Sequence, residues 1–196
     1  MKRCIFLDKD GTLIRDVPYN VDISKISFYE DIFESLQQLV ASGYSLILIS
    51  NQSGIARRYF DERALRLAFD HIGNEFLHQG LPILDYYFCP HLETSTCSCR
   101  KPLPGMIEQA ALKHQINLSQ SWMVGDILAD TAAGRAAGCR TILIDRSGLE
   151  RSLPLANHPS FAPDYVLDDF KNVSYTISNF NHTHDEYTRK ANTKNL

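Results

Sequence analysis

The stretch CIFLDKDGT (residues 4–12) decides the fold expected for this 196-residue chain. Its first four residues form an apolar run, which is typical of a strand in a parallel sheet that is covered on both faces. Asp8 and Asp10 follow directly, with Gly11 at the bend. Because ligands of open α/β sheets bind beyond the carboxyl ends of the strands, this stretch predicts a strand and a candidate site at its end.

Similar apolar runs recur along the chain, and amphipathic segments with helical spacing lie between them. This alternation predicts an α/β fold built on a doubly wound parallel sheet. Asp61 is placed to cap one helix, and Pro104 is placed to open another. The expected strands cover residues 4–8, 45–50, 86–89, 122–126, 141–145 and 164–169, and the expected helices cover 32–43, 61–80, 104–112 and 129–137.

The length and composition are those of a globular protein with one domain. Residues 1–180 are expected to form the domain, and the polar, aperiodic stretch 181–196 is expected to be a flexible C-terminal tail. The net charge of −3 gives no support for nucleic-acid or membrane binding as the main activity. The N-terminal apolar run is too short for a signal peptide or a membrane span, so we expect a cytoplasmic protein with reduced thiols. We also expect the protein to be a monomer.

The polar residues at the expected strand ends form one chemical set. DKDGT (8–12) and GDILAD (125–130) supply carboxylates, SNQSG (50–54) supplies hydroxyl and amide groups, and Lys101 follows the third strand. Gathered carboxylates repel each other unless a cation lies among them, and hard oxygen ligands suit Mg²⁺. One carboxylate can then attack phosphorus while the lysine, a hydroxyl and backbone N–H groups hold the phosphoryl oxygens. The set indicates phosphoryl transfer assisted by Mg²⁺.

Each of these motifs is weak evidence when it is taken alone. An Asp-x-Asp after an apolar run is most often a turn with a helix cap, and SNQSG is a turn signal. A GDxxxD pattern is common by chance. Their occurrence after successive strands, in order, argues against a purely structural explanation.

In this order the motifs resemble those of the haloacid dehalogenase (HAD) superfamily, over about residues 4–146. The resemblance implies a HAD-like Rossmannoid fold, in which Asp8 is the nucleophile that forms an aspartyl-phosphate. It also implies that Asp10 is the general acid/base. An aspartate at this position is similar to the phosphatase pattern, since hydrolysis needs a proton donor and then a base there.

The resemblance further implies a set of ligands for metal and phosphate. Asp8, the backbone carbonyl of Asp10, and Asp126 would hold Mg²⁺. Asp130 would have a supporting role near the metal or near Lys101. The residues implied for binding the substrate and its transferring phosphoryl group are Thr12, Ser50, Asn51, Arg100 and Lys101.

Three of the five cysteines gather with a histidine in CPHLETSTCSC (89–99). Cys89, His91, Cys97 and Cys99 form a Cys₃His set, which binds Zn²⁺ tetrahedrally as a closed, structural site. Free thiols and a disulfide are the alternatives, and a thioredoxin-like C-x-x-C is absent. We therefore expect zinc to organise a loop over residues 89–101.

This loop, with SNQSGIAR upstream, resembles the zinc-loop branch of HAD phosphatases, which includes heptose-bisphosphate and histidinol-phosphate phosphatases. GIAR (54–57) and PLPGM (102–106) favour a heptose bisphosphate as the phosphorylated sugar substrate. The five-residue spacer 92–96 is shared with the histidinol-phosphate enzymes and keeps that substrate open. No large cap domain is expected, so specificity is assigned to loop 15–28, the zinc loop, and the arginines that could meet a second phosphate, namely Arg57, Arg58 and Arg100.

Two functions without catalysis are alternatives to a phosphatase. A phospho-receiver domain also has a doubly wound sheet, an aspartate cluster and a lysine, but its phosphoacceptor would end the third strand, where this chain has Cys89. A zinc-held binding module with a dead active site would lack a motif residue, and none is missing.

Overall fold

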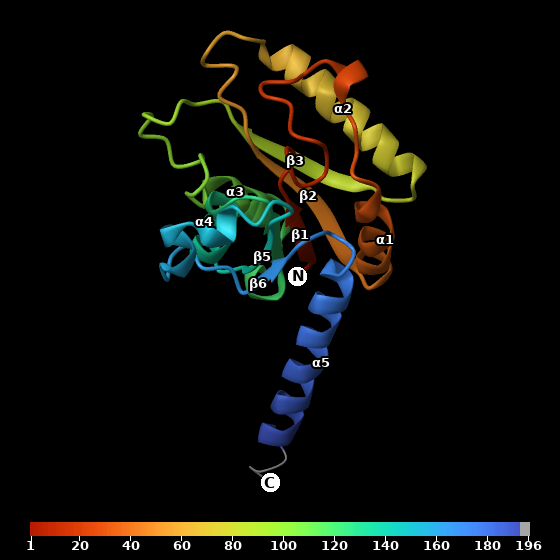
Figure 1. The fold of residues 1–196 in the computed structure, drawn as a ribbon. Coiled ribbons are helices and arrows are strands. Elements are labelled where there is room, and N and C mark those ends of the chain that lie inside the picture. The colour runs from red at the N-terminus through yellow and green to blue at the C-terminus, as the bar shows by residue number, and fades with distance from the viewer. Residues whose placement is uncertain (193–196) are drawn as a thin grey trace.

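The computed structural model describes residues 1–192 and contains the doubly wound α/β fold that the sequence pattern predicts (Figure 1). Six strands form one sheet in the order β3-β2-β1-β4-β5-β6, and every neighbouring pair is parallel. All six expected strands are confirmed. They are β1 (Arg3–Leu7), β2 (Tyr44–Asn51), β3 (Ile83–Cys89), β4 (Trp122–Gly125), β5 (Arg140–Ile144) and β6 (Tyr165–Leu167).

The order of the strands reverses direction at β1. The chain leaves β1 to form β2 on one side, and it later returns to form β4 on the other, so that Leu7 faces Leu48 of β2 and Val124 of β4. Open α/β sheets bind ligands outside the carboxyl ends of the strands at such a reversal. Asp8 is the first residue beyond β1, and its backbone N–H donates to the Val124 carbonyl oxygen at 3.0 Å. The fold therefore places Asp8 at the switch point of the sheet.

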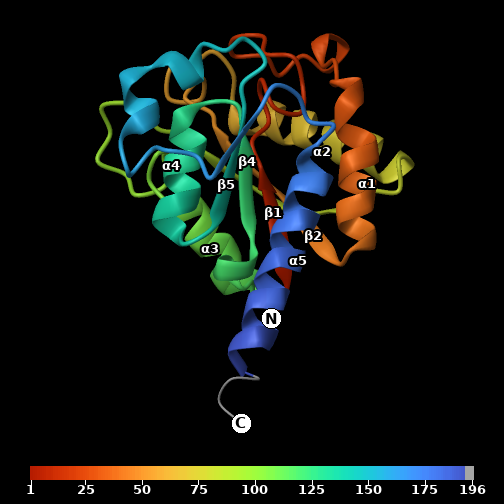
Figure 2. The same cartoon turned by 60° about the horizontal axis from the view of Figure 1, so that its bottom comes forward.

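Helices cover both faces of the sheet (Figure 2). Because successive strand residues point to opposite faces, Ile5 and Leu7 pack into one core, and Cys4 and Phe6 pack into the other. Side chains of α1, α2 and α5 complete the first core, and side chains of α3 and α4 complete the second. Burial on both faces explains why the run in β1 is apolar throughout.

The four expected helices are confirmed, and a fifth follows β6. The Asp61 carboxylate accepts a hydrogen bond from the Ala64 N–H at 2.8 Å, which caps the second helix as predicted. Gly138, with φ of +89°, ends the fourth helix in the left-handed conformation. The helices are α1 (Phe33–Ala41), α2 (Glu62–His78), α3 (Gly105–His114), α4 (Leu128–Ala137) and α5 (Val173–Asn192).

Five short 3₁₀ turns lie in the connections within residues 1–192, two of them between β1 and α1 and two between β5 and β6. Within residues 1–192, no connection contains a separate cap domain. Residues of the loop between β1 and α1 line a cavity together with residues at the carboxyl end of β2. The 3₁₀ turns are η1 (Ile23–Lys25), η2 (Glu30–Ile32), η3 (Leu118–Gln120), η4 (Glu150–Ser152) and η5 (Pro154–Asn157).

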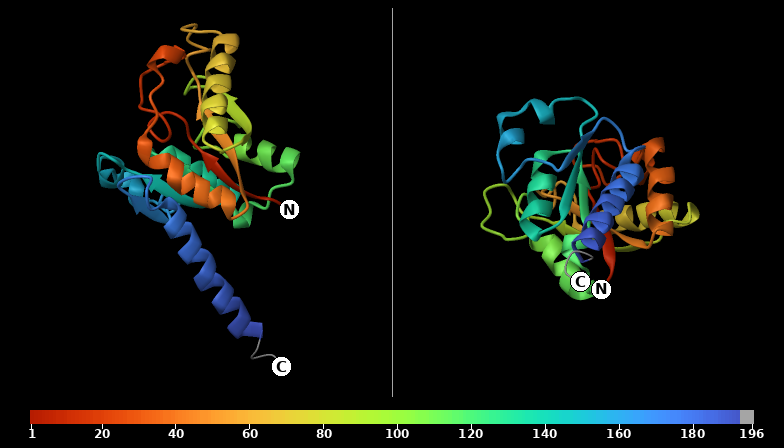
Figure 3. Two further views of the ribbon diagram at one scale, coloured as in Figure 1. Left: turned by 90° about the vertical axis from the view of Figure 1, so that its right-hand side faces the viewer. Right: turned by 90° about the horizontal axis from the view of Figure 1, so that it is seen from below.

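Helix α5 extends away from the sheet toward the C-terminus (Figures 1 and 3). Its first turns pack on the core through the buried side chains of Val173 and Ile177. The helix continues to Asn192, over most of the range that the sequence predicts as a tail. Residues 193–196 of that range lie outside the described residues, and the flexibility of the tail stays a prediction. No helix within residues 1–192 is long and apolar enough to cross a membrane.

Candidate active site

The carboxylates and the lysine at the strand ends meet in one cluster beyond β1 and β4. Lys101 Nζ lies 2.5 Å from Oδ1 of Asp8 and 2.5 Å from Oδ1 of Asp130. The same ammonium donates to the carbonyl oxygen of Ile49 at 3.0 Å. All three charged side chains are buried. Because buried charges persist only where they are paired and hydrogen-bonded, Lys101 fixes the positions of both carboxylates.

Asp126 completes a group of three carboxylates. One oxygen each from Asp8, Asp126 and Asp130 lies within 4.8 Å of the others. Thr12 Oγ1 donates to Asp126 Oδ1 at 3.0 Å and so orients that carboxylate. Gly11 has φ of +80°, and a Cβ at this position would collide with the Asp126 carboxylate. The donor set and its spacing match the oxygen ligands of Mg²⁺.

The cluster carries more negative charge than the protein neutralises. Burial raises the pKa of Asp8 to about 7, although the Lys101 ammonium opposes the shift. Burial, together with the charges of Asp8 and Asp130, raises the pKa of Asp126 to about 9. A divalent cation among these oxygens would supply the missing positive charge. The residues present therefore fit a bound Mg²⁺.

Asp10 is held by two side chains at the edge of a cavity. Lys9 Nζ lies 2.5 Å from Oδ1 of Asp10, and Gln52 Nε2 donates to Oδ2 at 3.0 Å. The Gln52 amide also donates to Ser50 Oγ at 2.8 Å. Asp10 lines a cavity of about 260 Å³ together with Asn51 and Gln52. This position suits a group that exchanges protons with a bound substrate and with water.

Asn51 is bonded to the backbone of the motif lysine. Its Nδ2 donates to the Lys101 carbonyl oxygen at 3.1 Å, and its Oδ1 accepts from the Lys101 N–H at 3.0 Å. These two bonds join the end of β2 to the segment after the zinc loop. Asn51 therefore orients Lys101, while contacts of Asn51, Ser50 and Thr12 with a phosphoryl group stay predictions.

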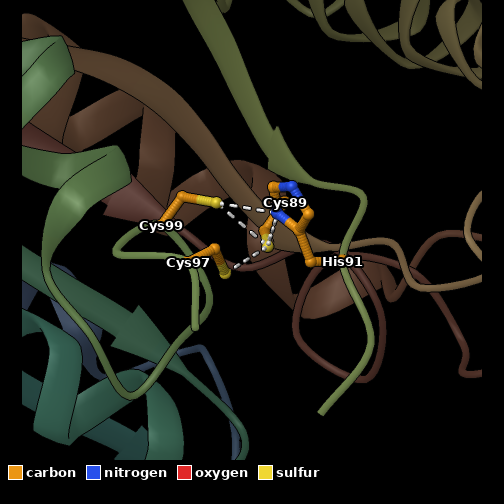
Figure 4. A group of neighbouring side chains, drawn as sticks. All are labelled: Cys89, His91, Cys97 and Cys99. Atoms are coloured by element: carbon orange, nitrogen blue, oxygen red, sulfur yellow. Dashed lines mark hydrogen bonds between the residues drawn. The ribbon is translucent and has the colours of Figure 1, made fainter. Parts of the chain in front are cut away.

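The four predicted zinc ligands converge on one point (Figure 4). The Sγ atom of Cys89 lies 3.4 Å from His91 Nδ1, 3.7 Å from Cys97 Sγ and 3.1 Å from Cys99 Sγ. Sulfur ligands at about 2.3 Å from a tetrahedral zinc ion lie about 3.8 Å apart. Cys89 ends β3, and the other three ligands lie on the loop that leads to Lys101. The arrangement fits a zinc ion that anchors this loop to the sheet.

The predicted substrate-binding arginines occupy two different environments. Arg57 and Arg100 both bond to Glu93, each at 2.7 Å. Arg58 is exposed and adopts the left-handed backbone conformation, with φ of +60°. The structure therefore brings Arg57 and Arg100 together at the zinc loop.

Sequence reasoning missed three residues of this region. Lys9 lies between the two motif aspartates, and its side chain is 2% exposed. Gln52 lies within SNQSG, so the motif itself is the signal that could have found it. Glu93 lies in the zinc-loop spacer, where an acidic residue near several arginines was the available clue.

Comparisons with known proteins agree with this geometry. A HAD-hydrolase-like family model matches residues 98–173. D-glycero-beta-D-manno-heptose-1,7-bisphosphate 7-phosphatase of Pasteurella multocida (strain Pm70) is 36% identical over 183 residues, which are 90% of this chain and 97% of that protein. D-glycero-alpha-D-manno-heptose-1,7-bisphosphate 7-phosphatase of Photorhabdus laumondii is 36% identical over 159 residues, which are 78% of this chain and 87% of that protein.

A solved structure shows the same relationship. D,D-heptose 1,7-bisphosphate phosphatase from B. bronchiseptica, complexed with magnesium and phosphate, has a TM-score of 0.77 and 29% identity, covering 91% of this chain and 99% of that chain. The fold, the ordered strand-end motifs and these similarities define a HAD phosphatase, an enzyme that hydrolyses phosphoric monoesters. Within that superfamily the chain belongs to the heptose-1,7-bisphosphate 7-phosphatase family.

Proposed function

We propose that this protein hydrolyses the 7-phosphate of D-glycero-D-manno-heptose 1,7-bisphosphate. The main support is the buried cluster in which Lys101 joins Asp8 and Asp130 at 2.5 Å each, beside Asp126. Such a cluster provides a nucleophile, a cation for the phosphoryl oxygens and ligands for a metal. The substrate assignment is supported by relatives of that name that match nearly the whole chain.

In the first step, a carboxylate oxygen of Asp8 attacks the phosphorus of the 7-phosphate. The bond between phosphorus and the sugar oxygen breaks as the bond between Asp8 and phosphorus forms. Asp10 donates its proton to the leaving sugar oxygen. Lys101 and Ser50 hold oxygens of the transferring group, which lowers the free energy of the transition state.

In the second step, Asp10 acts as a base. Its carboxylate accepts a proton from water, and the water oxygen attacks phosphorus as the bond to Asp8 breaks. Inorganic phosphate leaves, and the Asp8 carboxylate is restored. Lys9 and Gln52 hold the Asp10 carboxylate in place for both steps, since each contacts one of its oxygens.

Mg²⁺ is the proposed cofactor of this reaction. Asp8, Asp126 and the backbone carbonyl of Asp10 would hold it, with Asp130 in support through its ion pair with Lys101. When bound, the ion supplies positive charge to the phosphoryl oxygens and favours the ionised form of Asp8. The related bisphosphate phosphatase from B. bronchiseptica was crystallised with magnesium and phosphate.

A substrate panel tests the proposed function. We expect kcat/KM for heptose 1,7-bisphosphate to exceed kcat/KM for histidinol phosphate and fructose bisphosphate by roughly 100-fold or more. Histidinol phosphate lacks a second phosphate, and the sugar of fructose bisphosphate spaces its two phosphates differently. Phosphate release measures the rates, and identification of the product shows that the 1-phosphate is retained. The panel includes the alpha and the beta anomer of the heptose bisphosphate, since one relative is named for each.

Histidinol phosphate is the second candidate substrate. It is favoured by one observation, the five-residue spacer 92–96 between His91 and Cys97. A higher kcat/KM for histidinol phosphate than for either heptose bisphosphate would overturn the first assignment and leave the chemistry unchanged.

We also propose that Zn²⁺ occupies the Cys₃His cluster and keeps Arg100 and Lys101 in place. Replacement of Cys97 by Ser is expected to abolish zinc binding, lower the melting temperature by about 5–10 °C and reduce kcat/KM roughly tenfold. The reason is that the loop before Lys101 loses its anchor on β3. Metal analysis, thermal unfolding and phosphate release measure the three effects.

Cys139→Ala is the matched control for zinc binding. Cys139 is buried within the second core and lies outside the Cys₃His cluster. This variant is expected to retain one zinc ion per chain. Zinc-free protein with full activity and an unchanged melting temperature would contradict the coupling between the zinc loop and the active site.

We further propose that the enzyme acts as a monomer in the cytoplasm. In support, a single chain supplies the residues of both proposed metal sites and the acid/base. Sedimentation of the purified protein tests the oligomeric state.

A further inference from the structure

Two arginines from separate loops converge on the carboxylate of Glu93. Arg57 Nη2 lies 2.7 Å from Oε2, and Arg100 Nη2 lies 2.7 Å from Oε1. Each carboxylate oxygen therefore accepts from a different guanidinium group. Arg57 belongs to the loop between β2 and α2, whereas Arg100 immediately precedes Lys101. Glu93 thus joins the two segments that flank the active-site lysine.

Each of these guanidinium groups has a second partner. Arg100 Nη1 donates to the carbonyl oxygen of His91 at 3.2 Å, and the Arg100 side chain is 19% exposed. The guanidinium carbon of Arg57 lies 5.9 Å from the centre of the Tyr19 ring. Tyr19 lines the same cavity of about 260 Å³ that Asp10 lines. Arg57 therefore lies beside one residue of that cavity, and Glu93 holds Arg100 next to Arg57.

Glu93 itself is more exposed than either arginine. Its side chain is 53% exposed, and residues 93–96 of the spacer are all exposed. Exposed ion pairs contribute little net free energy, because water solvates the separated charges nearly as well. Another anion of higher charge can therefore take the place of this carboxylate at low cost.

We propose that Glu93 is a specificity-determining residue. In the free enzyme its carboxylate occupies the position between Arg57 and Arg100 that the non-reacting phosphate of the substrate takes in the complex. A phosphate has three acceptor oxygens and a charge of about −1.5 to −2, so it displaces the carboxylate, whereas a weaker anion or a neutral group does not. This role rests on the proposed function, because it requires a substrate with a second phosphate.

The opposite effect holds for a substrate that carries an ammonium group in place of the second phosphate. Glu93 would then bind the cation, and loss of its charge would weaken binding. One substitution therefore changes KM in opposite directions for a bisphosphate and for an amine such as histidinol phosphate.

Glu93→Gln tests this role, since the amide keeps the size of the side chain and loses its charge. KM for heptose 1,7-bisphosphate is expected to fall roughly three- to tenfold, about the effect of two partly exposed ion pairs, with little change in kcat. KM for heptose 7-phosphate, which lacks the second phosphate, is expected to stay within about twofold. Glu62→Gln is the matched control, because Glu62 pairs with Arg66 on α2 and its replacement changes the net charge equally.

The outcomes separate this role from the proposed function. If wild-type enzyme prefers the bisphosphate but KM in Glu93→Gln is unchanged or higher, with normal zinc content and melting temperature, the role of Glu93 is overturned alone. A higher KM would mean that Glu93 positions the arginines for the substrate. If wild-type enzyme turns over no heptose bisphosphate, the proposed function and the role of Glu93 both fail.

Discussion

Asp8→Asn is expected to reduce phosphatase activity by at least about 10⁴-fold, which is the scale of losses seen when a catalytic nucleophile is removed. The asparagine amide has nearly the same shape as the carboxylate but cannot form the bond to phosphorus. Asp8 is also the residue that joins Lys101 at 2.5 Å at the switch point of the sheet. Both binding and chemistry at this point therefore depend on its charge. Phosphate release from heptose bisphosphate in excess Mg²⁺ measures the loss.

The fold is expected to tolerate this substitution, so that lost activity does not reflect unfolding. Asp8 is one of three carboxylates that lie within 4.8 Å of one another, and its removal lowers their mutual repulsion. The melting temperature of metal-free Asp8→Asn should therefore equal or exceed that of metal-free wild type. Asp70→Asn, at an exposed position on α2, is the matched control and should keep full activity. Retention of more than about a tenth of wild-type activity in Asp8→Asn would contradict the assignment of Asp8 as the nucleophile.

The sequence predicts the sheet and the carboxylate cluster for the same physical reason. Strands buried on both faces need apolar side chains at nearly every position, so the four inner strands β1, β2, β4 and β5 are visible as apolar runs. The edge strands β3 and β6 are partly exposed, so their apolar pattern is weaker. Parallel strands end at one edge, so motifs that follow successive strands must meet there, as Asp8, Asp126 and Lys101 do. The zinc ligands are equally readable, because Cys89, His91, Cys97 and Cys99 lie close in the sequence.

Contacts between distant loops could not be predicted in this way. Asn51 bonds to the backbone of Lys101, fifty positions later, and nothing in either residue type specifies that partner. Lys9 was missed because lysine is usually exposed, whereas here the turn after β1 buries it against Asp10. The ion pair between Glu93 and Arg57 depends on where the zinc loop positions residues 92–96, which the sequence does not specify. These residues require three-dimensional geometry, and they surround the site rather than form its nucleophile.

Asp10→Asn is expected to reduce hydrolysis of heptose bisphosphate by about 10²- to 10⁴-fold, the usual contribution of a general acid/base. The asparagine can neither protonate the leaving sugar oxygen nor deprotonate the attacking water. The substrate p-nitrophenyl phosphate distinguishes the loss of the acid from the loss of the base. Its leaving group is stable as an anion and needs no proton, so only the second step needs Asp10. The first step should then stay fast and the second should stay slow. A burst of about one p-nitrophenol per enzyme, followed by slow turnover, is the expected result.

The burst distinguishes an acid/base from a residue that only binds substrate. If Asp10 only positioned the substrate, its replacement would slow the first step with both substrates, and no burst would appear. If Lys9 and Gln52 hold Asp10 as observed, Gln52→Ala should slow both steps on the sugar phosphate less than Asp10→Asn does, because the carboxylate remains but loses one of its two contacts. Quenched-flow measurement of p-nitrophenol release, with Asp70→Asn as the control, decides the matter. Asp10→Asn enzyme within about tenfold of wild type on heptose bisphosphate would show that proton transfer belongs to another group.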